Sequence, residues 1–139
     1  MKKTLSILGT NWIHILGFYI TTYVSLILFK LIGVEENQDE WRELLLISPF
    51  TIILLFFVYG LMIIGGFYGS ILLLDVIGFS IFRNKVTTVL FIEWILIILP
   101  FVQWAFDYEY WLWLTLSLSF LVTQWIRKQK IEKILKNVA

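Results

Sequence analysis

The chain has 139 residues, of which 60% are hydrophobic, 18% aromatic and only 15% charged, with a formal net charge of +1. Soluble domains carry roughly 45–50% apolar and about 25% charged residues, so this composition excludes an ordinary water-facing surface and predicts an all-α integral membrane protein. The absence of cysteine excludes disulfides, thiol redox chemistry and cysteine-ligated metals. Four helical spans of about 20 residues would use most of the chain. We therefore expect a single transmembrane domain over residues 1–139.

Three of the expected spans are predominantly apolar runs, which cover residues 12–32, 86–106 and 110–126. Each is close to the roughly 20 residues that a helix needs to cross a bilayer. Asn11 or Thr10 is available as the N-cap of the first run. We expect these helices and one further span to pack into a compact four-helix bundle.

The further span, expected over residues 49–74, belongs to an apolar stretch that is too long for one straight helix. The stretch runs from Pro49 to Phe82 and would measure about 51 Å as a helix, against a hydrocarbon core of roughly 30 Å. Glycines, which lower helix propensity, interrupt it several times. We therefore predict a break or kink between Gly60 and Asp75, followed by a short interfacial helix from Asp75 to Phe82.

The tail over residues 127–139 predicts a basic amphipathic helix that continues the last span. Its apolar residues recur at i, i+3, i+4 and i+7, with basic residues around them. We expect this helix to rest on anionic lipid headgroups, with a docking surface for another protein as the alternative. The headgroup-binding residues would be Arg127, Lys128, Lys130, Lys133 and Lys136.

The basic residues are segregated along the chain in a way that predicts its orientation. Nine of the eleven Lys and Arg residues fall at the N-terminus, in the loop at residues 83–85 and in the tail. Cytoplasmic segments of membrane proteins carry such an excess. We expect both termini to be cytoplasmic. The lysine- and isoleucine-rich composition suggests a bacterial cytoplasmic membrane.

Glu93 is the sharpest polar feature inside the apolar stretches. It lies about 12 Å along its helix from the preceding basic loop, at a depth where a lipid-facing carboxylate is costly. We expect its side chain to point into the bundle. Its expected partner is Thr21 or Ser119, or failing those Asp75 or His14. It would act as a proton or cation site, or only as an interhelical hydrogen bond.

Asp75 and His14 have structural interpretations of their own. Asp75 would cap the interfacial helix, and His14 would form an interfacial hydrogen bond. Together with Glu93 they fall in the cytoplasmic half of three different spans, and a histidine with two carboxylates can bind a divalent metal or relay a proton. The sequence does not show whether the three side chains converge, and it predicts no metal or other cofactor.

Small residues at helical spacing predict two packing stripes, each with members four residues apart. The stripe of the last span is Thr115, Ser119 and Thr123, and that of the first is Gly17, Thr21 and Ser25. Gly65 and Gly69 form a further small-xxx-small pair, which serves either helix packing or the bend of the second span.

No nucleophile–base pair, phosphate-binding glycine loop or clustered-histidine motif occurs in the sequence, so we do not expect an enzyme. Nucleic-acid binding is excluded because the basic tail belongs at a membrane surface. Two classes of function remain. The first is a scaffold or accessory subunit that acts through helix–helix association, in a homo-oligomer or a larger membrane complex. The second is an oligomeric proton or ion pathway, or a pore-forming protein, built around Glu93.

Overall fold

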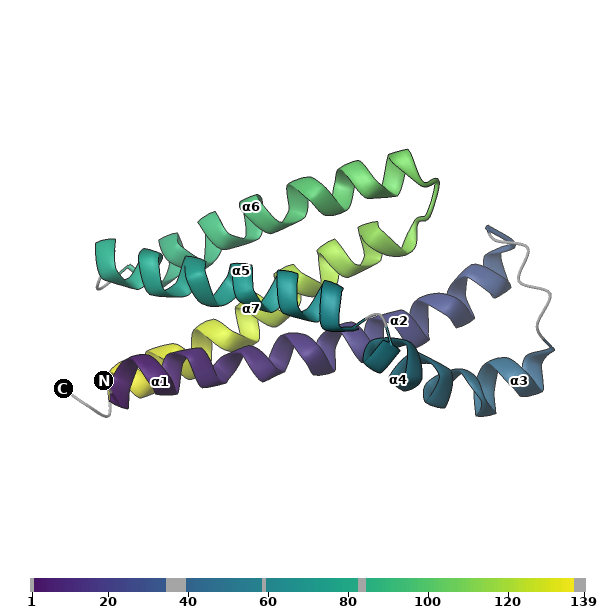
Figure 1. Cartoon of the computed structure of the whole chain (residues 1–139), viewed down its shortest axis with the longest axis horizontal. Helices are drawn as coiled ribbons and strands as arrows, with labels where there is room; N and C mark the ends of the chain where they lie inside the picture. The colour runs from purple at the N-terminus through teal and green to yellow at the C-terminus, as the bar shows by residue number, and fades with distance from the viewer. Residues whose placement is uncertain (1, 35–39, 59, 83–84, 137–139) are drawn as a thin grey trace.

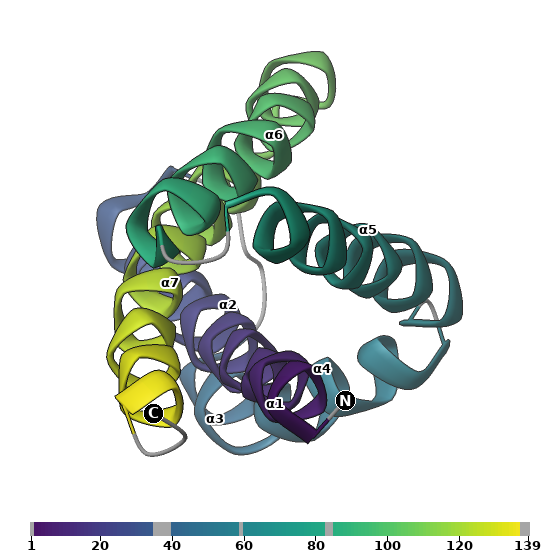
Figure 2. The ribbon, with the colours of Figure 1, turned by 90° about the vertical axis from the view of Figure 1, so that its left-hand side faces the viewer.

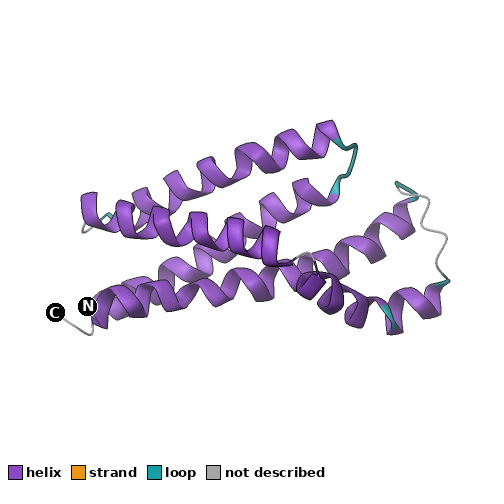
Figure 3. Ribbon diagram, viewed as in Figure 1, coloured by secondary structure: helices purple, strands orange, loops and turns teal. Residues whose placement is uncertain are grey.

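The computed structural model of the chain describes residues 2–34, 40–58, 60–82 and 85–136, and all regular structure in these ranges is helical (Figure 3). The elements in chain order are α1 (Lys2–Leu8), a 3-10 turn η1 (Gly9–Asn11), α2 (Trp12–Ile32), α3 (Trp41–Leu46), α4 (Ser48–Val58), α5 (Gly60–Ile81), α6 (Val86–Asp107) and α7 (Leu112–Lys136).

The first predicted span corresponds to α2, with α1 and η1 leading into it along the same direction (Figure 1). The helix ends before Gly33, whose φ of 70° lies in the left-handed region. Glycine adopts this conformation at a helix C-terminus without a Cβ clash. Contrary to the expectation, Asn11 does not cap α2, because its backbone is helical and its side chain forms no capping hydrogen bond.

The second apolar stretch is divided differently from the prediction. α4 ends at Val58 and α5 begins at Gly60, while Tyr59 lies outside the described residues. The helix axis changes direction between α4 and α5 (Figure 2). α5 then continues without interruption to Ile81. The stretch is therefore divided just before Gly60 and not between Gly60 and Asp75, and the predicted separate interfacial helix from Asp75 is wrong. A glycine inside a helix costs only about 1 kcal/mol relative to alanine, and the helix keeps its backbone hydrogen bonds there.

The helices form a ring in the order α7, α2, α4, α5 and α6, each packed against the next (Figure 2). α7 makes the most extensive contacts, with α6 on one side and α2 on the other. α5 packs directly against α6 but not along α7. The side chains that extend from α5 and α7 into the ring therefore decide how the two helices interact.

The start of α1 and the end of α7 lie at one end of the molecule, and the turn between α6 and α7 lies at the other (Figure 1). Two stretches, Thr4–Ile32 and Val86–Asp107, are long and apolar enough to cross a membrane. α7 begins at Leu112, two residues later than the predicted span, and remains helical to Lys136. The prediction that a helix continues from the last apolar run into the basic tail is confirmed over these residues.

Buried apolar side chains form two clusters inside the ring. One cluster, rich in phenylalanine, joins α2, α5, α6 and α7 around Phe18, Phe101 and Phe120. The other lies near the two ends of the chain, where Ile131 of α7 packs with Ile7 of α1. Ile131 has no exposed surface, so the apolar face of the basic tail is turned toward the other helices. The polar residues described next are buried near this second cluster.

Candidate functional site

Arg127 of α7 is completely buried, although its place in the basic tail predicted contact with lipid headgroups. Its Nε donates to Thr10 Oγ1 over 2.9 Å, and its Nη1 donates to Glu93 Oε2 over 3.1 Å. Its Nη2 forms an ion pair with Asp75 Oδ2. The expected headgroup role of Arg127 is therefore wrong, because the guanidinium is used inside the protein.

Two side-chain amides complete the bonds to these carboxylates. Asn11 Nδ2 donates to Asp75 Oδ2 over 2.8 Å, and Gln124 Nε2 donates to Glu93 Oε2 over 2.9 Å. The position of Asn11 explains why it does not cap α2, since its side chain is turned toward α5. We refer to the buried set as the charge cluster, which consists of Thr10, Asn11, Asp75, Glu93, Gln124 and Arg127.

The charge cluster joins η1, α5, α6 and α7, and it carries one more acid than base. With both carboxyl groups ionised, the two acids and one guanidinium sum to a charge of −1. Asp75 Oδ1 and Glu93 Oε1 are buried and have no hydrogen-bond partner among the described residues. Both carboxyl groups contact the same guanidinium, Asp75 at Nη2 and Glu93 at Nη1 of Arg127. One proton bound by either carboxyl group would remove the excess charge.

Glu93 points into the protein, as predicted, with 1% of its surface exposed. Its partners differ from those expected. Thr21 and Ser119 bond to each other instead, with 2.7 Å between their hydroxyl oxygens. Asp75 pairs with Arg127, and it does not cap an interfacial helix, because α5 continues through it to Ile81. The difference arises because Arg127 supplies a stronger, charge-assisted donor at the depth of Glu93.

His14 is fully buried but lies beside the charge cluster without a hydrogen bond to it. Its Nδ1 is 2.7 Å from Thr123 Oγ1, and its ring centroid is 4.6 Å from that of Phe120. Nε2 has no hydrogen-bond partner among the described residues. His14, Asp75 and Glu93 therefore do not form one three-ligand site, and no metal-binding group of three such residues occurs in the described part of the chain.

The two predicted packing stripes face each other along the antiparallel pair α2 and α7. Ser25 Oγ donates to Thr115 Oγ1 over 3.0 Å, about one helical turn from the hydrogen-bonded pair of Thr21 and Ser119. At the next position Gly17 lies against Thr123, and a Cβ at Gly17 would clash with the Thr123 methyl group. The small residues thus allow close approach of the two helices.

The remaining predicted residues lie on outer surfaces. A Cβ added to Gly65 or Gly69 would meet nothing within 4 Å, so no described helix packs on this face of α5. Lys128 pairs with Glu132 over 3.8 Å, and the Lys130 ammonium lies 4.4 Å from the centre of the Trp12 ring. Lys133 and Lys136 are exposed in the last turn of α7.

Charge pattern alone did not predict that Arg127 and Gln124 belong to a buried site, although the helix periodicity contains a signal for both. Phe120, Gln124, Arg127 and Ile131 are spaced by four, three and four residues, which places them on one face of a helix. Phe120 and Ile131 are apolar and buried. The face that they define therefore carries Gln124 and Arg127 into the protein.

The chain was compared with protein-family models, curated proteins and solved structures, and none of them matches it. The function is therefore inferred from the chemistry of the charge cluster and from the surfaces around it.

Proposed function

We propose that the chain is an integral membrane protein with four spans and that both of its ends are cytoplasmic, in a bacterial cytoplasmic membrane. Support comes from the two long apolar stretches and from the exposed large apolar side chains on α4, α5 and α7. The lysines of α7 lie at the end of the molecule where α1 begins. Basic residues gathered at one end match the usual charge bias of cytoplasmic segments.

We further propose that the charge cluster binds one proton and serves a proton or ion pathway. The observation that carries this proposal is a pair of buried carboxyl oxygens, Asp75 Oδ1 and Glu93 Oε1, which have no hydrogen-bond partner among the described residues although both carboxyl groups contact the buried Arg127 guanidinium. An uncompensated charge is expensive to bury. Binding one proton removes that charge, and an ionisable group at this depth of a membrane protein is a typical functional site.

The polar stripes between α2 and α7 do not extend the cluster into a complete pathway within one chain. Successive hydrogen-bonded pairs of these stripes, such as those that contain Ser119 and Thr115, are four residues apart, or about 6 Å along the helix. A hydrogen bond spans only about 3 Å between heavy atoms. The proposed pathway therefore requires several copies of the chain, which would together supply a polar route to the cluster.

Infrared spectroscopy of the protein in liposomes tests whether the cluster holds a proton. Wild type at neutral pH should show the carbonyl stretch of a protonated carboxylic acid that exchanges slowly with deuterium. Asp75→Asn and Glu93→Gln should each abolish this band, because one carboxylate then balances Arg127. Glu132→Gln is the matched control and should keep the band, since Glu132 is half exposed and pairs with Lys128. Absence of the band in wild type would refute proton binding.

Proton flux into the same liposomes tests the pathway. Wild type should dissipate a pH gradient several-fold faster than empty liposomes, Glu93→Gln should reduce the rate to the empty-liposome level, and Glu132→Gln should not. If the band of the protonated carboxylic acid is present but proton flux does not exceed that of empty liposomes, the pathway is excluded and the second candidate function, described next, remains.

The second candidate is a scaffold or accessory subunit that acts through helix–helix association. The open face of α5 favours it, since Gly65, Gly66 and Gly69 are exposed and face no other described helix. Small residues at this spacing let another helix approach closely in a membrane. Energy transfer between labelled copies in liposomes tests association. Gly65→Leu should reduce the energy transfer. Leu54→Phe, a change at another exposed site, should leave it unchanged. Equal energy transfer for wild type and both variants would count against a role in association.

A further inference from the structure

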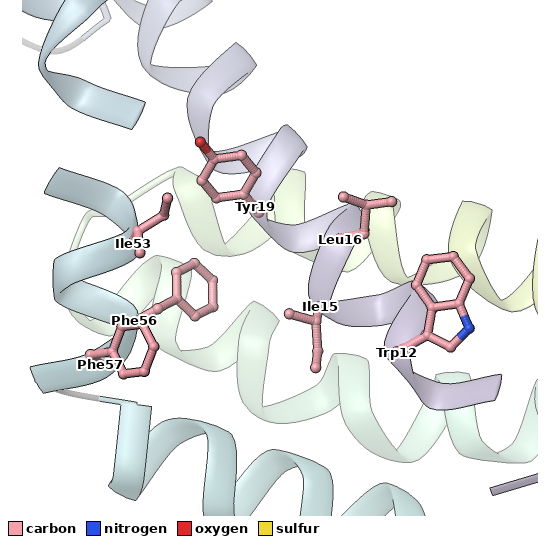
Figure 4. A pocket seen from close by; sticks show the side chains of 7 residues that line it. All are labelled: Trp12, Ile15, Leu16, Tyr19, Ile53, Phe56 and Phe57. Carbon is pink, nitrogen blue, oxygen red and sulfur yellow. The ribbon is translucent and has the colours of Figure 1, made fainter. Parts of the chain in front are cut away.

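An apolar groove lies between α2 and α4, on the outside of the ring, and has a volume of about 500 Å³. Side chains from the two helices face each other across it (Figure 4). The main contributors are Trp12, Ile15 and Tyr19 from α2 and Ile53, Phe56 and Phe57 from α4. The stretch from Trp12 to Tyr19 gives the groove a length of about 10 Å along α2.

The groove offers almost no polar group to a ligand. The Tyr19 hydroxyl, the main polar atom among its lining side chains, donates to the Pro49 carbonyl over 3.4 Å. The indole of Trp12 borders the groove at the end nearer the start of the chain (Figure 4). Whatever occupies the groove is therefore apolar along its length, as a hydrocarbon chain is.

One end of the groove carries a positive charge. Lys130 of α7 holds its ammonium 4.4 Å from the centre of the Trp12 ring, a cation–π contact at the groove's border. Lys130 is exposed, and it forms no ion pair with any carboxylate in the part of the chain that the structure describes. Lys128, two residues earlier, is engaged by Glu132. Among the basic residues whose side chains the structure describes, Lys130 is thus the one placed to meet an anion at this groove.

We infer that this groove is a binding site for an anionic phospholipid. Its acyl chain lies between α2 and α4, and its phosphate contacts the Lys130 ammonium beside Trp12. A tryptophan at headgroup level, a cation next to it and an apolar channel leading away reproduce the order of groups in a lipid. Basic side chains between membrane helices bind anionic headgroups in this manner. The inference requires a surrounding bilayer but neither of the two proposed functions.

Native mass spectrometry of the delipidated, detergent-solubilised full chain tests the site with phosphatidylglycerol and phosphatidylcholine of identical acyl chains. Wild type should bind phosphatidylglycerol about fivefold more tightly, as expected for one basic residue near a membrane surface. Lys130→Gln should remove this preference, and Lys128→Gln, the matched control, should retain it. Ile53→Trp fills the groove from its half-exposed lining and should weaken binding of both lipids.

Three results would overturn the inference. Equal binding of the two lipids by wild type would show that the anionic headgroup is not recognised. If Lys130→Gln and Lys128→Gln weakened the preference for phosphatidylglycerol equally, the preference would come from general attraction to the basic tail and not from a site at Lys130. If Ile53→Trp dissociated a dimer and left lipid binding unchanged, the groove would be covered by a second copy of the chain.

Discussion

Asp75 of α5 and Arg127 of α7 form an ion pair in which neither side chain has any exposed surface. The two helices do not pack directly along each other, so the pair reaches across the inside of the ring. Asn11 joins it from η1 and Glu93 from α6. The position of α5 therefore depends on a polar contact at one end and on the phenylalanine-rich cluster further along.

Replacement of Arg127 by methionine should strongly destabilise the protein. The substitution leaves two carboxyl groups buried without their cation, and removing one partner of a buried ion pair costs about 3–5 kcal/mol. The free energy of unfolding, measured by titration with denaturing detergent in mixed micelles, should fall by that amount. Lys128→Met on the surface of the same helix is the control and should change it by about 0.5 kcal/mol or less. Equal losses for both variants would contradict the assignment of Arg127.

The excess acid in the cluster predicts non-additive substitutions of Asp75 and Glu93. Asp75→Asn or Glu93→Gln alone leaves one carboxylate for one guanidinium, so each should change the free energy of unfolding by only about 1 kcal/mol. The double variant leaves Arg127 buried without a counter-ion. Its loss should exceed the sum of the single losses by about 2–3 kcal/mol. Additive losses in the same unfolding assay would mean that the three side chains do not share one charge balance.

Gly17→Ala should destabilise the contact between α2 and α7. The new Cβ would clash with the Thr123 methyl group, and overpacking of this kind costs about 1–3 kcal/mol. Adding Thr123→Ser should restore part of the loss, because serine lacks the methyl group but keeps the hydroxyl that contacts His14. Gly65→Ala is the control: with open space around it, alanine should be neutral or stabilising by up to about 1 kcal/mol. Thermal unfolding in detergent would rank the stabilities of wild type, the two single variants and the double variant.

The proposed topology predicts the location of each connection. Reporter fusions after Asn37 and after Asp107 should report an extracytoplasmic location, and fusions after Asn84 and at Ala139 a cytoplasmic one. Because the chain has no cysteine, single introduced cysteines can be labelled from each side as an independent measurement. An extracytoplasmic C-terminus would require an odd number of spans and would rule out the four-span topology.

The sequence alone predicted the features that depend on local pattern. The boundaries of α2 match the expected span, and α6 ends at Asp107, one residue beyond the expected limit. The inward direction of Glu93 followed from the cost of exposing a carboxylate to lipid. The stripes that contain Thr21 and Ser119 were visible as four-residue spacings, although the sequence did not show that they face each other. Each of these features is set by residues within a few turns of one helix.

The tertiary structure decided which groups meet across the ring. Arg127 follows the last apolar run and precedes Lys128, so charge pattern alone assigned it to the lipid surface, whereas its helix face, shared with Phe120 and Ile131, carries it inside. Asp75 remains within α5 because the chain turns before Gly60 and not after it. The pairing of these two residues, 52 positions apart, depends on how α5 and α7 are placed around the ring. Helix placement follows from the summed packing of all elements, which no local spacing encodes.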